Sequence, residues 1–155
     1  MGISSLSNTN GFYTSLLIGI NSLLSSSRCN HVTAIGEAAL RGSQTSNYSI
    51  AVGHGAFAYS TGVNNSVAVG QNAAESSYSA NGYNNFIGWQ AGLRSTGNGY
   101  SNAIGYSAGK SADLNQSNVM GSQAGSAYSA SFIIPTLSGS VAIGYRAAAV
   151  GVSDN

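Results

Sequence analysis

The chain has 155 residues, of which five are basic and four acidic, so its formal net charge is +1 at pH 7. Charged residues make up only 6% of the sequence, far below the ~25% that is usual for a soluble domain, and they form no basic patch. This composition argues against nucleic acid as a partner. No stretch is long and apolar enough to predict a transmembrane helix, so we expect no membrane insertion.

Glycine recurs with a nearly constant period along the whole chain. The successive gaps are 17, 17, 17, 17, 18, 17, 16 and 23 residues. A short fixed period indicates units that stack on their neighbours, because one unit alone cannot bury its apolar residues. The recurring residues are Gly2, Gly19, Gly36, Gly53, Gly70, Gly88, Gly105, Gly121 and Gly144.

Each glycine follows an aliphatic residue or Met, and the clearest copies of the unit are β-branched, as in Ser-Val-Ala-Val-Gly at residues 66–70. This run predicts a short strand, and the Ser- and Asn-rich remainder of the unit predicts turns and a second short strand. A unit of 17 residues suits one coil of a β-solenoid. We therefore expect an all-β fold in which residues 1–155 form a single array of about nine coils, a rod of ~40 Å at ~4.8 Å per coil.

The strand is apolar on both faces, which predicts that both faces are covered. We expect the residue just before the glycine to face the inside of the coil and the residue two before it to face outward, against another copy of the chain. The predicted subunit interface therefore consists of Ala34, Ala51, Ala68, Phe86, Ala103, Val119 and Ala142.

Asparagine recurs three residues before the glycine, at Asn85, Asn102 and Asn118. Stacked asparagines can form a hydrogen-bonded ladder. The alternative is that asparagine only tolerates the adjacent turn.

The 23-residue gap predicts an insertion loop at residues 126–139, between the last two coils. It contains the apolar run Phe132, Ile133 and Ile134, which could contact a receptor or another protein, or cover the neighbouring subunit. The repeat is already in phase at Gly2, and the last unit runs to Asn155 without a polar cap, so we expect a segment of a longer fibre.

The residue after each glycine varies freely, which indicates a surface position. Trp89, Tyr106 and Tyr145 occupy it and could provide stacking faces for sugars or protein. The alternative is that they pack along the flank of the coil or at the subunit interface. Tyr48, Tyr83 and Tyr100 recur five residues before the glycine and predict a structural ladder.

Residues with catalytic potential are few and scattered. Glu37 and Glu75 are about two coils apart and out of phase, which does not suit the paired carboxylates of a glycoside hydrolase. His31 and His54 have no companions at metal-ligand spacing, and Cys29 is the single cysteine. We expect no enzyme activity, no metal and no cofactor.

The core sequence Ser-Val-Ala-Ile-Gly at residues 140–144 resembles the head repeats of trimeric autotransporter adhesins of the YadA type. Asn-Ala-Ile-Gly-Tyr-Ser-Ala-Gly at residues 102–109 resembles a repeat of bacteriophage tail fibres, and residues 85–92 are similar. The resemblance implies a left-handed parallel β-roll that assembles as a coaxial homotrimer. The period is longer than that of the adhesin repeat, which favours the phage family.

The resemblance therefore implies a structural and adhesive segment of a virion tail fibre that contacts other virion proteins and a host-surface glycan or protein. The alternative is the head of a bacterial trimeric adhesin, located on the cell surface. A third possibility, a monomeric ice-binding solenoid, requires a regular threonine array that the sequence does not contain.

Overall fold

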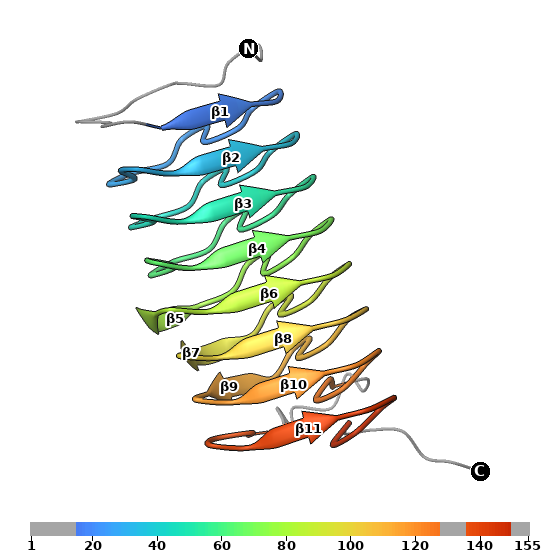
Figure 1. Ribbon diagram of the computed structural model, residues 1–155. Coiled ribbons are helices and arrows are strands. Elements are labelled where there is room, and N and C mark those ends of the chain that lie inside the picture. Colours follow the sequence, from blue (N-terminus) through green and yellow to red (C-terminus); the bar gives the residue numbers. More distant parts are fainter. Residues whose placement is uncertain (1–14, 128–135, 150–155) are drawn as a thin grey trace.

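The computed structural model describes residues 15–127 and 136–149, and within these segments the protein is a β-solenoid without helices (Figure 1). Eleven short strands form two parallel sheets. The larger sheet contains β1 (Leu16–Ile18), β2 (Thr33–Ile35), β3 (Ile50–Val52), β4 (Val67–Val69), β6 (Asn85–Ile87), β8 (Asn102–Ile104), β10 (Asn118–Met120) and β11 (Val141–Ile143). The smaller contains β5 (Ser79–Gly82), β7 (Thr96–Gly99) and β9 (Asp113–Asn115).

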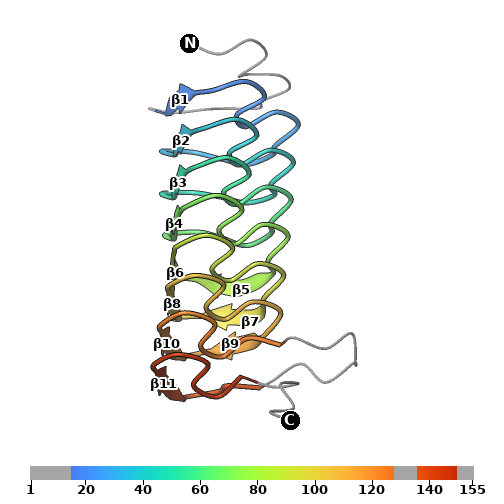
Figure 2. The same ribbon diagram turned by 90° about the vertical axis from the view of Figure 1, so that its right-hand side faces the viewer.

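The strands of the larger sheet stack in chain order, each one repeat below its predecessor (Figures 1 and 2). Ile50 pairs with Val67, and Ala51 with Ala68, so equivalent residues of successive units form vertical columns. The chain makes six uninterrupted turns from β1 to β10. The predicted parallel solenoid with a period of about 17 residues is confirmed. Its ninth unit, at Gly2, lies outside the described residues.

The predicted insertion loop between the last two coils includes residues at both ends that belong to the regular stack. The amide of Ala127 donates to the carbonyl of Lys110 at 3.0 Å, and that of Leu137 donates to the carbonyl of Asp113 at 2.9 Å. Both bonds continue the ladder between coils. Residues 126–127 and 136–139 therefore belong to the regular stack, while Phe132, Ile133 and Ile134 lie outside the described residues.

The glycine that ends each strand is required by its stacking. Gly70 has a φ of +131°, and a Cβ on it would lie 2.5 Å from the carbonyl oxygen of Gly88 in the next coil. The backbones of successive coils thus approach closely at the glycine column, as the sequence suggested.

The turns contain an unusual number of left-handed residues. Within the described segments, 25 non-glycine residues have φ between 51° and 62°. They recur at fixed positions of the repeat; Ala38, Asn72, Gln90 and Ser107 all lie two after the glycine. Each costs on the order of 1 kcal/mol. Hydrogen bonds between coils offset this cost, as where the Ser107 amide donates to the Trp89 carbonyl at 2.8 Å.

The residue two before the glycine faces the interior of the coil, which contradicts the predicted interface. The side chains of Ala34, Ala51, Ala68, Phe86, Ala103 and Val119 are fully buried, and Ala142 nearly so. The residues on either side of it in each strand point outward. Strand alternation places this residue on the same side as the buried residue four before the glycine, such as Ser66, and the interior accepts Phe86 and Val119 there as well as alanine.

The core is filled by complementary columns. Four residues after the glycine stand Leu40 and Phe57 in early coils but Gly92 in a later one. A Cβ on Gly92 would lie 2.1 Å from the Phe86 ring, which occupies the same space from the strand side. Large residues thus alternate between two columns, which keeps the thin interior filled.

Buried serines complete the interior by bonding the next coil. Ser60 Oγ donates to the Ala74 carbonyl at 2.6 Å, and Ser43 Oγ donates to the Phe57 carbonyl at 2.5 Å. A hydroxyl that would be costly if unpaired in the core is thereby satisfied, and adjacent coils are joined.

Candidate binding surfaces

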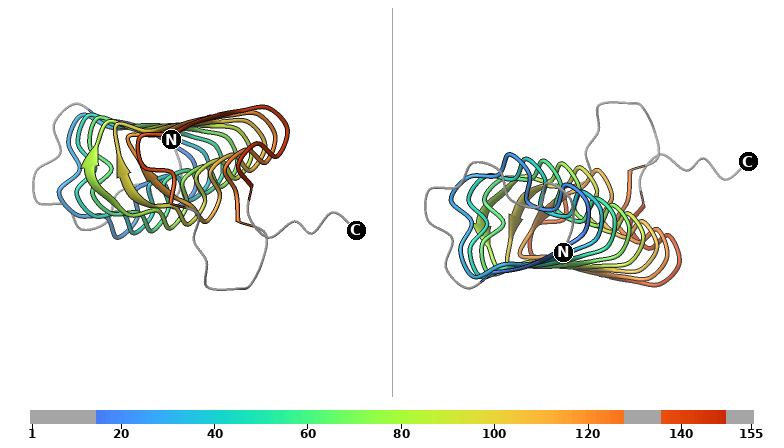
Figure 3. Two further views of the ribbon diagram at one scale, coloured as in Figure 1. Left: turned by 90° about the horizontal axis from the view of Figure 1, so that it is seen from below. Right: turned by 90° about the horizontal axis from the view of Figure 1, so that it is seen from above.

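The outer side of the larger sheet is an uncharged and largely apolar surface, which we name the flat face. It consists of the side chains one and three residues before each glycine. Val69 is 37% exposed and Ile87 is 40% exposed, and no charged residue occurs in either column. The end-on views show the coils aligned along this straight side (Figure 3). The columns contain Leu16, Ile18, Thr33, Ile35, Ile50, Val52, Val67, Val69, Asn85, Ile87, Asn102, Ile104, Asn118, Met120, Val141 and Ile143.

The predicted asparagine ladder forms the polar part of the flat face. Asn85 Nδ2 donates to Asn102 Oδ1 at 2.7 Å, and Asn102 Nδ2 donates to Asn118 Oδ1 at 2.6 Å. The amides therefore satisfy one another along the column. This part of the face presents few free polar groups outward, despite its asparagines.

Exposed aromatic residues stack at two other columns. Tyr83 and Tyr100 have parallel rings with centroids 5.1 Å apart, and His31 stacks on Tyr48 at 4.9 Å. The predicted ladder five residues before the glycine is therefore found for Tyr83 and Tyr100, whereas Asn65 stands between Tyr48 and Tyr83 in this column. One turn apart in the column after the glycine, Trp89 and Tyr106 stack at 4.8 Å with ring planes 9° apart. We name Trp89 and Tyr106 the aromatic platform.

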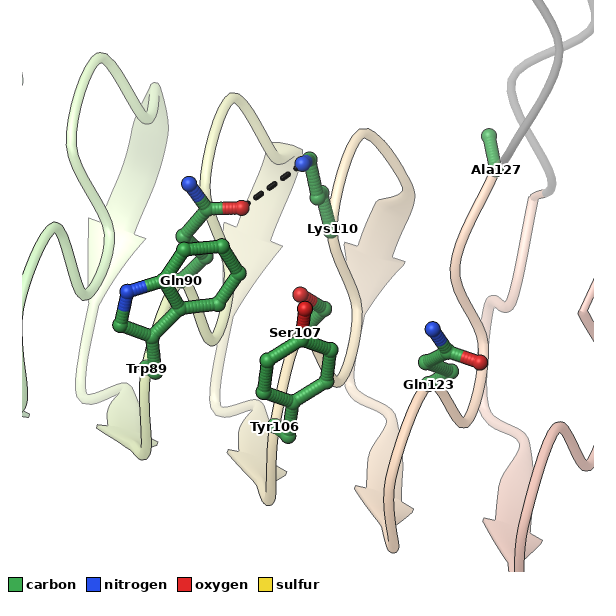
Figure 4. Close-up of a pocket in the computed structure, with 7 residues that line it drawn as sticks. All are labelled: Trp89, Gln90, Tyr106, Ser107, Lys110, Gln123 and Ala127. Carbon is green, nitrogen blue, oxygen red and sulfur yellow. Dashed lines mark hydrogen bonds between the residues drawn. The ribbon is translucent and has the colours of Figure 1, made fainter.

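A pocket of about 220 Å³ lies beside the aromatic platform, lined by Trp89, Gln90, Tyr106, Ser107, Lys110, Gln123 and Ala127. Figure 4 shows Ser107 between Tyr106 and Lys110, with Gln90 on one side and Gln123 on the other. Gln90, Ser107 and Gln123 occupy the same position in three successive coils. The pocket exists because a short serine stands between two long glutamines.

Two cations border the pocket through its glutamines. Lys110 Nζ donates to Gln90 Oε1 at 2.7 Å, and Arg146 Nε donates to Gln123 Oε1 at 3.0 Å. Both acceptors are neutral amides. Glu75 lies in the coil next to that of Gln90, and Asp113 lies three residues after Lys110 at the start of β9, but neither lines the pocket. Among the described residues that line the pocket, Lys110 is the one charged side chain and none carries a carboxylate.

The other predicted contact residues are separated from this pocket or lie outside the described part. Tyr145 is exposed two turns beyond Tyr106, and the Arg146 guanidinium lies 5.1 Å from its ring centroid. Sequence reasoning identified Trp89 and Tyr106 but missed Gln90, Lys110 and Gln123. The available signal was the short Ser107 between glutamines at equivalent positions.

The described residues contain no group of three or more His, Cys, Asp or Glu that could hold a metal ion. Cys29 is buried, and its Sγ donates to the Ser27 carbonyl at 3.3 Å. Burial raises the pKa of the Cys29 thiol above its ordinary value. This thiol is therefore a core residue and a poor nucleophile.

Comparison with protein-family models, with curated proteins and with solved structures finds no match for this chain. Among the described residues, no helix has the length and apolar character needed to span a membrane.

Proposed function

We propose that the chain is a structural and adhesive segment of a bacteriophage tail fibre, in which three left-handed coils assemble side by side as a homotrimer. The observation that carries the proposal is the flat face, an uncharged surface over eight stacked strands in which the column just before the glycine is apolar throughout. Monomeric soluble proteins rarely expose a continuous apolar surface of this kind.

Further copies of the same chain are the partner that best fits this face. Its side chains repeat at the spacing of the coils, so a second copy in parallel alignment presents matching ridges at every level. Neither column contains a charge that would oppose close approach. Closed symmetry then leaves no apolar face exposed.

Such a rod would act by position and valency, without breaking a bond. Three copies of each outward-facing residue would be held at fixed spacing on a stiff support, which raises the avidity for a host-surface glycan or protein. The remaining partners would be other tail or fibre proteins of the virion.

The molar mass in solution, measured by light scattering, tests the assembly. We expect three times 15.6 kDa for the unmodified chain. Val69→Glu should give a folded monomer, because three carboxylates would be brought together at an apolar contact. Gln71→Glu, exposed two residues later, should assemble normally.

Ala68→Glu separates assembly from folding. Ala68 is fully buried in the coil, so we expect this variant to lose its β-sheet circular dichroism. A folded monomer from the unmodified chain, or a Val69→Glu variant that still assembles, would contradict the proposal.

A further inference from the structure

We propose that the pocket over Ser107 binds a pyranose sugar that carries a carboxylate, as found in uronic and sialic acid residues of surface glycans. This inference rests on the proposed adhesive function and names its ligand class. It derives from three features of the pocket: an aromatic platform, a row of amides and the positive charge of Lys110.

The aromatic platform supplies an apolar surface of the size of a sugar ring. Trp89 is 38% exposed and Tyr106 is 49% exposed, although they stack on each other. Figure 4 shows the two rings offset along the column with their planes turned in the same direction. The C–H groups on one face of a pyranose pack against such rings, and their polar edges are free to bind hydroxyls.

The polar groups lie on one flank of the aromatic platform, where the hydroxyls of a stacked sugar would project. Gln90 and Gln123 offer amide donors and acceptors on two sides of Ser107. Because Ser107 is short, the hollow between them admits a ring substituent. A few convergent polar groups beside an aromatic wall are typical of small-ligand sites.

The positive charge of Lys110 favours a sugar that carries a carboxylate over a neutral sugar. Lys110, the only lysine of the chain, reaches the pocket and bonds the Gln90 amide, so its charge is not neutralised there. Arg146 adds a second cation through Gln123. Glu75 lies in the coil next to that of Gln90, but no carboxylate is among the residues that line the pocket. A carboxylate on the sugar would gain a charge-assisted bond to Lys110 by displacing the neutral amide.

The test uses the fluorescence of Trp89, the only tryptophan of the chain, as a direct reporter. The probes are two matched pairs: 3′-sialyllactose with lactose, and a hyaluronan tetrasaccharide with neutral chitotetraose. We expect a saturable change with at least one acidic probe and about tenfold weaker binding of its neutral counterpart.

Variants followed by calorimetry identify the contributing groups. Trp89→Ala should weaken binding of the acidic probe about tenfold or more. Lys110→Gln should remove the preference for the acidic member while neutral binding is retained. Tyr100→Ala, at the other stacked column, should bind normally. Thermal melting of each variant shows whether it is folded.

Three results would overturn the inference: no binding of either acidic probe, unchanged binding by Trp89→Ala, or an unchanged preference in Lys110→Gln. Shielding of Trp89 from acrylamide quenching in the assembled protein would do so too. Light scattering on the same samples keeps the two proposals distinct. A trimer that adheres to cells without binding these sugars refutes the proposed ligand class. A monomer refutes the proposed fibre assembly, and its binding of the acidic probes still tests the pocket.

Discussion

At the scale of single residues, glycine has two separable roles at the end of each strand. Gly70 and Gly144 share a positive φ, +131° and +126° respectively. A Cβ on Gly70 would collide with the backbone of Gly88, whereas a Cβ on Gly144 would meet nothing within 4 Å. The first position therefore combines conformational strain with a steric clash, and the second has strain alone.

Alanine substitutions separate these two effects. Gly70→Ala should lower the free energy of unfolding by ~3 kcal/mol or more, because two coils must move apart. Gly144→Ala should lower it by ~1 kcal/mol through backbone strain alone. Chemical denaturation followed by circular dichroism measures both, and equal losses would argue against close backbone contact between coils.

The paired core columns give a second prediction at this scale. Phe86→Ala should cost ~3–5 kcal/mol through the cavity it leaves. Gly92→Phe should also destabilise, because it overpacks against Phe86. The double variant recreates the arrangement of Ala51 with Phe57, so we expect it to recover a large part of the combined loss. If the losses in free energy of unfolding were additive, a large side chain in one column would not compensate for a small one in the other.

At the scale of the element, the strand was predictable from sequence but its facing was not. Residues 66–70 show the β-branched pattern that ends at Gly70, and β4 is found there. Both faces of this strand are apolar, so alternation does not tell which one is inside. The structure places Ala68 inside, on the same side as the buried Ser66, and Val69 outside; size does not decide the facing, because Phe86 is buried at the equivalent position of β6.

The turns permit a test of backbone strain. Ser76 is exposed with a φ of 54°, and the equivalent position two coils earlier is Gly42. Ser76→Gly should therefore raise the free energy of unfolding by ~0.5 kcal/mol. Ser77→Gly should lower it, because the buried Ser77 hydroxyl bonds Ser60 Oγ at 3.4 Å. The melting temperatures of the two variants test this prediction. Destabilisation by both substitutions would mean that the left-handed turns are unstrained.

At the scale of the whole molecule, the fixed period was sufficient to predict the parallel stack, because each unit must pair with the next in register. The pocket was harder to predict from the sequence, since it depends on three residues from successive coils: Gln90, Ser107 and Gln123. Their equivalence becomes informative only when the coils are aligned vertically. The trimer stays a prediction, now placed on the flat face.

A quasi-one-dimensional stack should tolerate loss of one whole unit. Removing residues 33–49 brings Ile50 into the place of Thr33, its partner in the parallel ladder. We expect this variant to fold, with a melting temperature lowered by a few degrees. Removing residues 33–41 alone places turn residues against strands and should abolish the cooperative transition. Similar behaviour of both deletions would contradict a register set by the repeat.

The hydrogen bonds between coils all run along the axis of the rod, as in the glycine and serine columns. Tension applied to the two ends therefore loads one coil at a time, because the hydrogen bonds of the terminal coil break before those of the next coil bear the force. Each coil that peels away would release ~17 residues, or ~55 Å of extended chain, with little resistance from the coils behind it. A single solenoid would therefore be weak under direct pull, and association of several chains side by side would give it tensile strength.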